Sequence, residues 1–176
     1  MEIVILIGGK GFKIKKISKK KPKPLLKIGN NSIIDYQLKS LSKIKKKIFL
    51  LSNKKYSKFH IYLKKKYKNI KFEIVEEDTP LGTGGCLRSL MKYKHKNYLI
   101  IFGDLIFNIN FKKFCEFHIK NKSDITFLVH PNDHPFDSDI LEVNEKNRLI
   151  QFHKKPHKKN NIGNLSLSGI LIINEK

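Results

Sequence analysis

The sequence predicts an α/β fold, a mostly parallel mixed sheet with helices on both faces, in one domain spanning residues 1–176. Short apolar runs alternate with longer stretches whose apolar residues recur at helical spacing, as parallel strands joined by crossover helices require. A chain of 176 residues has the length of one domain with a substantial core. We find no internal repeat and no linker-like segment, which favours a single layered domain.

Five apolar runs predict the strands. Each is short, and each is followed by glycine, proline or polar residues; they lie at residues 3–7, 47–51, 71–75, 98–102 and 125–130. Four stretches between or after them predict helices. In the first, Ser32 can cap a helix that carries Ile34, Leu38 and Leu41 on one face, with Asp35 at the capping-box position. The other three helices are expected at residues 56–67, 84–91 and 111–121.

The first strand runs into a glycine-rich turn, which a lysine between two prolines follows. Gly8, Gly9 and Gly11 let the backbone bend tightly and point N–H groups at an anion. In Pro22-Lys23-Pro24 the lysine supplies a point charge and the prolines fix its backbone. The glycine spacing fits neither G-x-G-x-x-G nor G-x-x-x-x-G-K-[ST]. A glycine turn alone indicates an ordinary tight turn, but with the lysine segment it predicts a phosphate-binding loop.

This arrangement resembles the opening signature of the sugar-1-phosphate nucleotidylyltransferases, the NDP-sugar pyrophosphorylases: a strand, G-G-x-G-T-R-L, then P-K-P-L. Phe12 and Lys13 replace the threonine and arginine of that signature. The resemblance implies the three-layer Rossmann-like fold of the nucleotide-diphospho-sugar transferases. It also implies that Gly8, Gly9 and Gly11 bind the nucleotide phosphates, with Lys23 and Lys13 as catalytic cations.

Two later segments follow predicted strands, at the edge where an open α/β sheet binds its ligand. Residues 80–85, P-L-G-T-G-G, are similar to the family's P-L-G-T-[AG]-G segment, which implies that Gly82 and Gly85 lie against the nucleotide base. Asp104 follows the fourth strand, where a lone aspartate is more often a cap. The resemblance implies instead that Asp104 is a ligand of Mg²⁺, a hard cation that takes one or two carboxylates.

Residues 130–139, H-P-N-D-H-P-F-D-S-D, are dense in histidine and aspartate. We discount a zinc site, because Pro131 and Pro135 break the helix that H-x-x-x-H ligation needs. The segment resembles one in the D-glycero-D-manno-heptose 1-phosphate guanylyltransferases and in their fusions to HAD-type phosphatases. Lys155, before Pro156-His157, matches the family's sugar-phosphate lysine in F-x-x-K-P-H. Residues 163–170 resemble G-N-L-V-N-A-G-I, with Leu167 in place of the second asparagine.

The composition bears on partners and location. The formal net charge is +22, but only Arg88 and Arg148 are arginine among 37 basic residues, and the lysines are scattered. Nucleic-acid readers favour arginine and concentrate charge on one face, so we expect no nucleic-acid function. Cys86 and Cys115 lack metal-ligand spacing and suit reduced thiols in a cytoplasmic protein. With no apolar stretch long enough to span a bilayer and no signal pattern, no membrane partner is expected.

The resemblance implies transfer of a nucleoside monophosphate from an NTP, with GTP favoured, to a sugar 1-phosphate, with heptose 1-phosphate favoured. The products are an NDP-sugar, used for lipopolysaccharide or another surface polysaccharide, and pyrophosphate. Members of this family continue past the last matched segment and supply a second metal-binding aspartate, so we expect a C-terminally truncated domain. A homo-oligomer and a fused or adjacent HAD phosphatase are left open as partners. The alternative function, favoured by the changes at Phe12, Lys13 and Leu167, is a degenerate nucleotide or sugar-phosphate binding protein.

Overall fold

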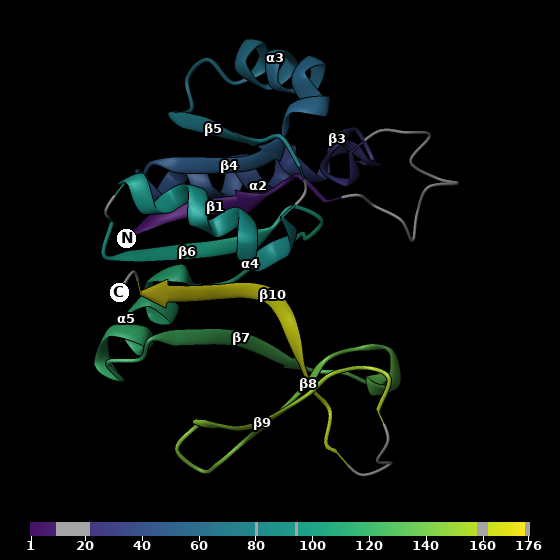
Figure 1. Cartoon of the computed structure of the whole chain (residues 1–176), viewed down its shortest axis with the longest axis vertical. Helices are drawn as coiled ribbons and strands as arrows, with labels where there is room; N and C mark the ends of the chain where they lie inside the picture. Colours follow the sequence, from purple (N-terminus) through teal and green to yellow (C-terminus); the bar gives the residue numbers. More distant parts are fainter. Residues whose placement is uncertain (10–21, 80, 94, 158–161, 175–176) are drawn as a thin grey trace. The chain divides into compact units, whose positions relative to one another are not determined.

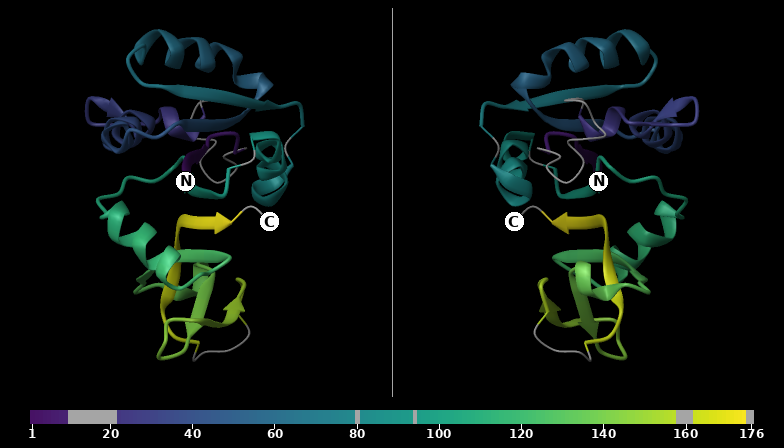
Figure 2. Two further views of the ribbon diagram at one scale, coloured as in Figure 1. Left: turned by 90° about the vertical axis from the view of Figure 1, so that its left-hand side faces the viewer. Right: turned by 90° about the vertical axis from the view of Figure 1, so that its right-hand side faces the viewer.

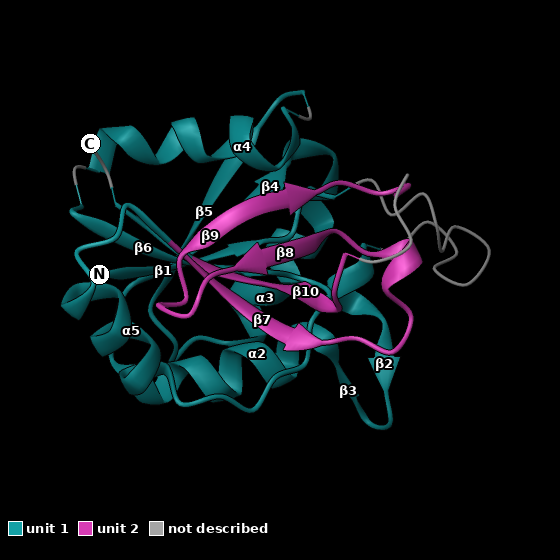
Figure 3. Cartoon of the chain, turned by 90° about the horizontal axis from the view of Figure 1, so that it is seen from below, with its two compact units in different colours: residues 1–125, 172–176 teal, residues 126–171 magenta. Residues whose placement is uncertain are grey.

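The computed structural model describes residues 1–9, 22–79, 81–93, 95–157 and 162–174 (Figure 1). The chain divides into two compact units, coloured separately in Figure 3. Unit 1 comprises Met1–Ile125 with Ile172–Lys176, and unit 2 comprises Thr126–Leu171. Among the described residues, no helix has the length and apolar character that crossing a membrane requires.

The described part of unit 1 is built on parallel strands in the order β5-β4-β1-β6, seen side by side in Figure 1. Their bounds are Glu2–Leu6 for β1, Ile48–Asn53 for β4, Phe72–Glu77 for β5 and Asn97–Phe102 for β6. The four strands predicted here are confirmed, with ends shifted by one or two residues. Ile5 of central β1 pairs with Leu50 and Ile101, and all three side chains are buried. Strands covered on both faces read as continuous apolar runs, which is why the sequence revealed them.

Helices lie on both faces of these strands. Figure 2 shows α2 (Ile33–Leu41) and α5 (Phe111–Lys120) on one face, and α4 (Gly82–Leu87) on the other. In α2 the predicted apolar face of Ile34, Leu38 and Leu41 is buried, and the Ser32 N–H donates to Asp35 Oδ2 at 2.8 Å. Among the described residues of unit 1, a further α-helix, α3, spans Ser57–Lys66.

The predicted helix at residues 84–91 differs from the observed structure. The α-helix begins at Gly82 and ends at Leu87, and a 3₁₀ helix, η5 (Arg88–Tyr93), continues the chain. Glycines are poor helix formers, which keeps α4 short. The Ser89 hydroxyl donates to the carbonyl of Cys86 at 2.7 Å, a side-chain bond that competes with the α-helical pattern.

The described part of unit 1 also contains shorter elements. The hairpin of β2 (Lys27–Ile28) and β3 (Asn31–Ser32) turns at Gly29, whose φ is 63°. The other short elements are 3₁₀ helices: η2 at Lys23–Leu25, η3 at Ser42–Ile44 and η4 at Lys54–Tyr56.

The strands that follow make up unit 2, apart from one end of two of them. They are β7 (Ile125–Pro131), β8 (Ile140–Val143), β9 (Leu149–His153) and β10 (Leu165–Asn174), with the 3₁₀ helix η6 at Pro135–Asp137. The first residue of β7 and the last three residues of β10 belong to unit 1. β8 pairs antiparallel with both β10 and β9, and β7 pairs with β10. The predicted strand at residues 125–130 is confirmed as β7. All five predicted strands are thus present in the structure.

Candidate functional site

A cavity of about 430 Å³ lies in unit 1 at the carboxyl ends of the parallel strands. Its walls come from the turn after β1, from η2, from the end of β5, from α4 and from the turn after β6. Five of the predicted site residues line it: Gly8, Gly9, Lys23, Gly82 and Asp104. Gly11 and Lys13 lie outside the described residues. The cavity therefore occupies the position at which open α/β sheets bind their ligands.

The two described glycines of the first turn have different surroundings. A Cβ on Gly8 would lie 3.3 Å from Glu77 Oε1 and 3.4 Å from the Ser52 Cα, so Gly8 allows β1 and its neighbours to pack closely. A Cβ on Gly9 would meet nothing within 4 Å. The backbone at Gly9 is thus open on its cavity side, where an anion can approach its N–H group.

Lys23 and Asp104 both line the cavity and form an ion pair there. Lys23 Nζ lies 2.8 Å from Asp104 Oδ2, and the two side chains are 29% and 38% exposed. Gly103 brings them together, because a Cβ there would lie only 2.6 Å from the Leu6 carbonyl oxygen and 3.1 Å from Pro24 Cγ. The Gly103 N–H instead donates to the Leu6 oxygen at 3.0 Å. A cation and a carboxylate are thereby held beside the glycine turn.

Gln37, which the sequence did not single out, supports the turn that carries Asp104. Its side chain is 1% exposed, and its Nε2 donates to the carbonyl oxygens of Phe102 at 2.9 Å and Leu105 at 2.8 Å. These two oxygens flank Gly103 and Asp104, so α2 fixes the carboxyl end of β6. The sequence signal for this residue was a glutamine placed at helical spacing among the apolar residues Ile34, Leu38 and Leu41.

The opposite wall contains α4 and the end of β5. Gly82, with a φ of 75°, lines the cavity, whereas Gly85 packs within α4, where a Cβ would lie 2.7 Å from the Cβ of Leu81. Glu77 also lines the cavity, and its Oε2 accepts from the Leu81 N–H at 3.4 Å. Sequence reasoning missed Glu77, although its place at the end of a strand and before the glycine segment was a usable signal.

Cys86 lines the same wall. Its Sγ donates to the Thr83 carbonyl at 3.0 Å. Burial, reinforced by the charge of Glu77, raises the pKa of this thiol to about 11. Because the thiolate is the reactive form, Cys86 is a protonated and weak nucleophile at neutral pH.

Lys155 belongs to unit 2, in the segment that follows β9. Its Nζ donates to the carbonyl oxygen of Asp137, and its backbone N–H donates to Asp139 Oδ1 at 3.1 Å. The predicted sugar-phosphate lysine is therefore held by the histidine- and aspartate-rich segment, at residues 137 and 139.

Known proteins share both the sequence and the fold of this chain. Residues 2–176 match the family model described as nucleotidyl transferase. A D-glycero-α-D-manno-heptose 1-phosphate guanylyltransferase of Aneurinibacillus thermoaerophilus is 30% identical over 99% of this chain and 75% of that protein. A mannose-1-phosphate guanyltransferase of Aspergillus oryzae is also 30% identical, over 99% of this chain but only half of that protein.

The solved structures show the same relationship. HddC from Yersinia pseudotuberculosis, crystallised as a complex with GMP-PN, superposes with a TM-score of 0.80 at 25% identity, over 98% of this chain and 76% of that one. The resemblance drawn from the glycine and lysine motifs is thus confirmed at the level of family and fold. The chain belongs to the nucleotidyl transferase family of enzymes, among the sugar-1-phosphate nucleotidyltransferases.

Proposed function

We propose that this protein transfers guanosine monophosphate from GTP to a sugar 1-phosphate, with heptose 1-phosphate as the preferred acceptor. The observation that carries the proposal is the cavity of unit 1, where the glycine turn, Lys23, Asp104 and Glu77 surround one space of about 430 Å³. The relatives described above support the choice of substrates: they include a heptose 1-phosphate guanylyltransferase, a mannose-1-phosphate guanyltransferase and a structure in complex with GMP-PN.

The reaction needs positioned charge rather than a protein nucleophile. A phosphate oxygen of the sugar 1-phosphate attacks the α-phosphorus of GTP, and the bond from that phosphorus to the pyrophosphate oxygen breaks. Backbone N–H groups at Gly8 and Gly9 bind phosphate oxygens, while Lys23 neutralises the charge that develops on the α-phosphate. The protonated Cys86 thiol does not compete for the phosphorus.

The residues present fit a magnesium ion held together with the nucleotide. In the part of the chain that the structure describes, no three His, Cys, Asp or Glu side chains gather into a closed metal cage. Asp104 is a partly exposed carboxylate at the phosphate end of the cavity, and Mg²⁺ is commonly held by one or two carboxylates, substrate phosphates and water. When bound there, the ion would neutralise phosphate charge. We therefore propose Asp104 as its protein ligand.

Glu77 supplies a physical reason for guanine. An ionised carboxylate only accepts hydrogen bonds, and the Watson–Crick edge of guanine presents two adjacent donors, N1–H and the 2-amino group. One carboxylate can accept from both, which makes a paired, charge-assisted contact. Adenine presents a donor beside an acceptor and cannot form that pair. We propose that Gly82 forms the flat edge against the base, with Gly85 supporting it from within α4, and that Glu77 accepts from the donors of the base.

The acceptor side of the proposal rests on Lys155, which would bind the phosphate of the sugar. Because an ammonium is a point charge without shape selectivity, this contact recognises the phosphate and does not choose among sugars. We place the reaction in the cytoplasm, where nucleoside triphosphates are made and used.

The test is pyrophosphate release from a panel of four nucleoside triphosphates against heptose, mannose and glucose 1-phosphates, with and without Mg²⁺. We expect the fastest release with GTP, heptose 1-phosphate and Mg²⁺ together. Tight binding of GTP with no release under any combination would overturn the proposal and indicate a nucleotide-binding protein without catalysis. Faster release with another nucleotide would contradict the role given to Glu77.

A further inference from the structure

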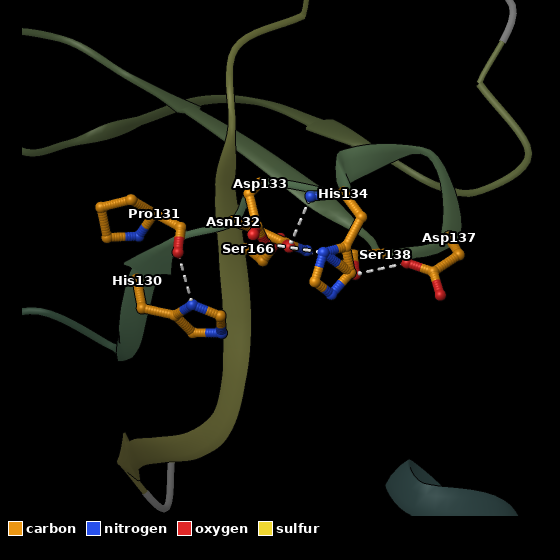
Figure 4. A network of polar contacts seen from close by, with 8 residues as sticks. All are labelled: His130, Pro131, Asn132, Asp133, His134, Asp137, Ser138 and Ser166. Carbon is orange, nitrogen blue, oxygen red and sulfur yellow. Dashed lines mark hydrogen bonds and ion pairs between the residues drawn. The ribbon is translucent and has the colours of Figure 1, made fainter.

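The loop at residues 132–139, which follows β7, is organised around one buried asparagine (Figure 4). Asn132 is 8% exposed, and its Nδ2 donates to Ser138 Oγ at 2.9 Å and to Ser166 Oγ at 3.0 Å. Its Oδ1 accepts from the His134 N–H at 3.0 Å. Both donors and the acceptor of the amide are therefore used, and they join both ends of the loop to β10.

Of the charged side chains of the segment, Asp133 and His134 lie at the surface, whereas Asp137 Oδ1 accepts from the Ser138 hydroxyl at 3.3 Å. His134 and Asp133 pair with each other at 2.6 Å, and their side chains are 75% and 92% exposed. His130 Nδ1 contacts the Pro131 carbonyl oxygen at 2.8 Å (Figure 4). These pairings, all local in sequence, account for the density of histidine and aspartate without a bound ligand.

The outer side of the 132–139 loop holds the segment that carries Lys155. The Asp139 carboxylate accepts from the Lys155 N–H at 3.1 Å, and the Asp137 carbonyl accepts from the Lys155 ammonium. His157 Nε2 donates to the Ser138 carbonyl oxygen at 2.7 Å, with the Pro135 carbonyl oxygen at 3.2 Å. Acceptors at residues 135, 137, 138 and 139 thus hold both ends of a three-residue segment.

This contact has a consequence for ligand binding. A lysine side chain free in solvent samples many rotamers and loses that freedom when it binds. A lysine whose backbone and ammonium are already fixed loses less, so its contact with a phosphate is stronger. The ammonium has three donors, and the bond to the Asp137 oxygen uses one of them. With respect to the described residues, two donors stay available for a phosphate.

We propose that the 132–139 loop positions Lys155 for the phosphate of the acceptor, with Asn132 as the positioning residue that gives the loop its shape. The proposal rests on the proposed function only in assigning the acceptor phosphate to Lys155. In this proposal, residues 130–139 and 155–157, both in unit 2, act together: the first segment fixes the position of the second.

The first experiment measures the position of Lys155 without using activity. The purified protein is acetylated with an N-hydroxysuccinimide ester, and modification of each lysine is followed by mass spectrometry with exposed Lys27 as the internal reference. In the wild-type protein we expect Lys155 to react more slowly than Lys27, and in Asn132→Ala to react at the rate of Lys27. Asn144→Ala is the matched control, since Asn144 also caps a turn of unit 2, accepting from Lys146 and Arg148 N–H groups. Unchanged Lys155 reactivity in a folded Asn132→Ala protein would overturn the proposal.

Two further variants guard against misfolding of Asn132→Ala. Asn132→Asp keeps the acceptor for the His134 N–H. The Ser166 hydroxyl can then donate to the new carboxylate, and the Ser138 hydroxyl can do so in exchange for its 3.3 Å bond to Asp137 Oδ1, so we expect this variant to preserve the slow reaction of Lys155. Asp139→Ala removes the acceptor of the Lys155 N–H and leaves Asn132 in place, so we expect it to speed the reaction. If Asp139→Ala leaves the reactivity of Lys155 at the wild-type value, the proposal is wrong.

The second experiment uses turnover, with heptose 1-phosphate and GTP as substrates. We expect Asn132→Ala to raise the KM for heptose 1-phosphate by about tenfold, while the KM for GTP changes less than about twofold. Lys155→Met should raise the same KM by at least as much. An increase with Lys155→Met but none with Asn132→Ala would overturn the positioning role. No increase with Lys155→Met would instead remove the assignment of the phosphate to Lys155, and the acetylation result would then decide positioning by itself.

Discussion

Gly103 shows how tightly one residue can be constrained by the site it serves. A Cβ at this position would come within 2.6 Å of the Leu6 oxygen, a backbone atom that cannot move without disturbing β1. We expect Gly103→Ala to lower the free energy of unfolding by about 1–3 kcal/mol, the usual cost of forcing atoms into a packed interior. Urea unfolding measures this. Gly9→Ala is the control, because a Cβ there meets nothing within 4 Å, and a similar loss in both variants would contradict the packing argument.

Lys23 is the described cation that the mechanism needs most. Lys23→Met keeps the aliphatic length and removes the charge, so we expect kcat to fall by about 10²–10³-fold, as when one transition-state donor is removed. Folding should be unaffected, because partly exposed ion pairs contribute little to stability. Pyrophosphate release measures the effect, with Lys27→Met on exposed β2 as the matched control. Equal activity of both variants would exclude Lys23 from catalysis.

Replacing the Glu77 carboxylate should change the preference for GTP over ATP. Glu77→Gln replaces one acceptor oxygen by an amide donor, which faces a guanine donor unfavourably. We expect kcat/KM for GTP to fall by about tenfold or more, and the ratio of ATP to GTP turnover to rise. Glu145→Gln, in the exposed turn between β8 and β9, serves as the control. A proportional loss with both nucleotides would show that Glu77 acts on the cavity wall rather than on the base.

These residues also mark the limit of sequence reasoning at this scale. The position of Gly8, Gly9, Lys23, Gly82 and Asp104 at the cavity could be predicted because each matches a segment of the family that the chain resembles, while their chemical roles stay predictions. Glu77 and Gln37 carry no such motif, and their importance depends on which way a side chain points at the end of a strand or along a helix. The direction of such a side chain depends on strand register and on packing, and neither can be read directly from the sequence.

At the scale of elements, a partly buried polar network connects α3 to the sheet. His60 of α3 lies 2.7 Å from Ser52 Oγ through Nε2 and 2.6 Å from Glu76 Oε1 through Nδ1. Ser52 of β4 and Glu76 of β5 are register partners, so one imidazole joins two neighbouring strands. Ser52 is 1% exposed and lies outside the cavity wall, which gives the network a structural role rather than that of a reactive serine.

This network predicts a non-additive pair of substitutions. His60→Phe leaves the buried Ser52 hydroxyl without its partner, and we expect a loss of about 1–3 kcal/mol in the free energy of unfolding. Ser52→Ala in the same background removes the stranded hydroxyl, so the double variant should be more stable than the sum of the two single losses predicts. Urea unfolding of all four proteins completes the cycle. Strict additivity would mean that His60 and Ser52 do not stabilise each other.

Which elements could be predicted follows from how they are buried. β1, β4 and β6 are covered on both faces and appear in the sequence as apolar runs. β9 could not be recognised in that way, since Leu149, Ile150 and Phe152 are exposed along it. β10 contains Gly169, with a φ of 79°, and a glycine within an apolar run weakens the sequence signal for a strand. The strands of unit 2 therefore gave weaker signals than those of unit 1.

At the scale of the whole molecule, the net charge of +22 makes acid stability a sensitive property. Burial alone would raise the pKa of Asp35, but hydrogen bonds from Lys66 and from the Ser32 N–H hold it below its ordinary 3.8. Hydrogen bonds from Lys47 and Tyr93 likewise hold the pKa of Glu73 below its ordinary 4.5. Both carboxylates bind protons less readily in the folded chain than in the unfolded chain.

The sign of the pH dependence follows from these directions. Near pH 4 the unfolded chain binds more protons, so the free energy of unfolding rises with pH there and falls as the solution is acidified through the folded-state pKa values. We expect the urea midpoint to be level from pH 7 to about 5 and to fall below it. Asp35→Asn should lower the midpoint at pH 7 and flatten its decline, whereas Asp133→Asn, at an exposed position, should do neither. A midpoint that rises on acidification would contradict this account.

The ion pair between Lys23 and Asp104 also bears on whether a nucleotide enters the cavity with or without bound magnesium. Without ligand, the two charges cancel, and neither is left without a counter-charge. A nucleotide that arrives with its magnesium offers a new partner to each: phosphate to the ammonium and metal to the carboxylate. A bare nucleotide offers a partner only to the ammonium and leaves the carboxylate beside phosphate oxygens of its own sign. In the proposed mechanism, this exchange of partners would favour binding of the metal–nucleotide complex over binding of the free triphosphate.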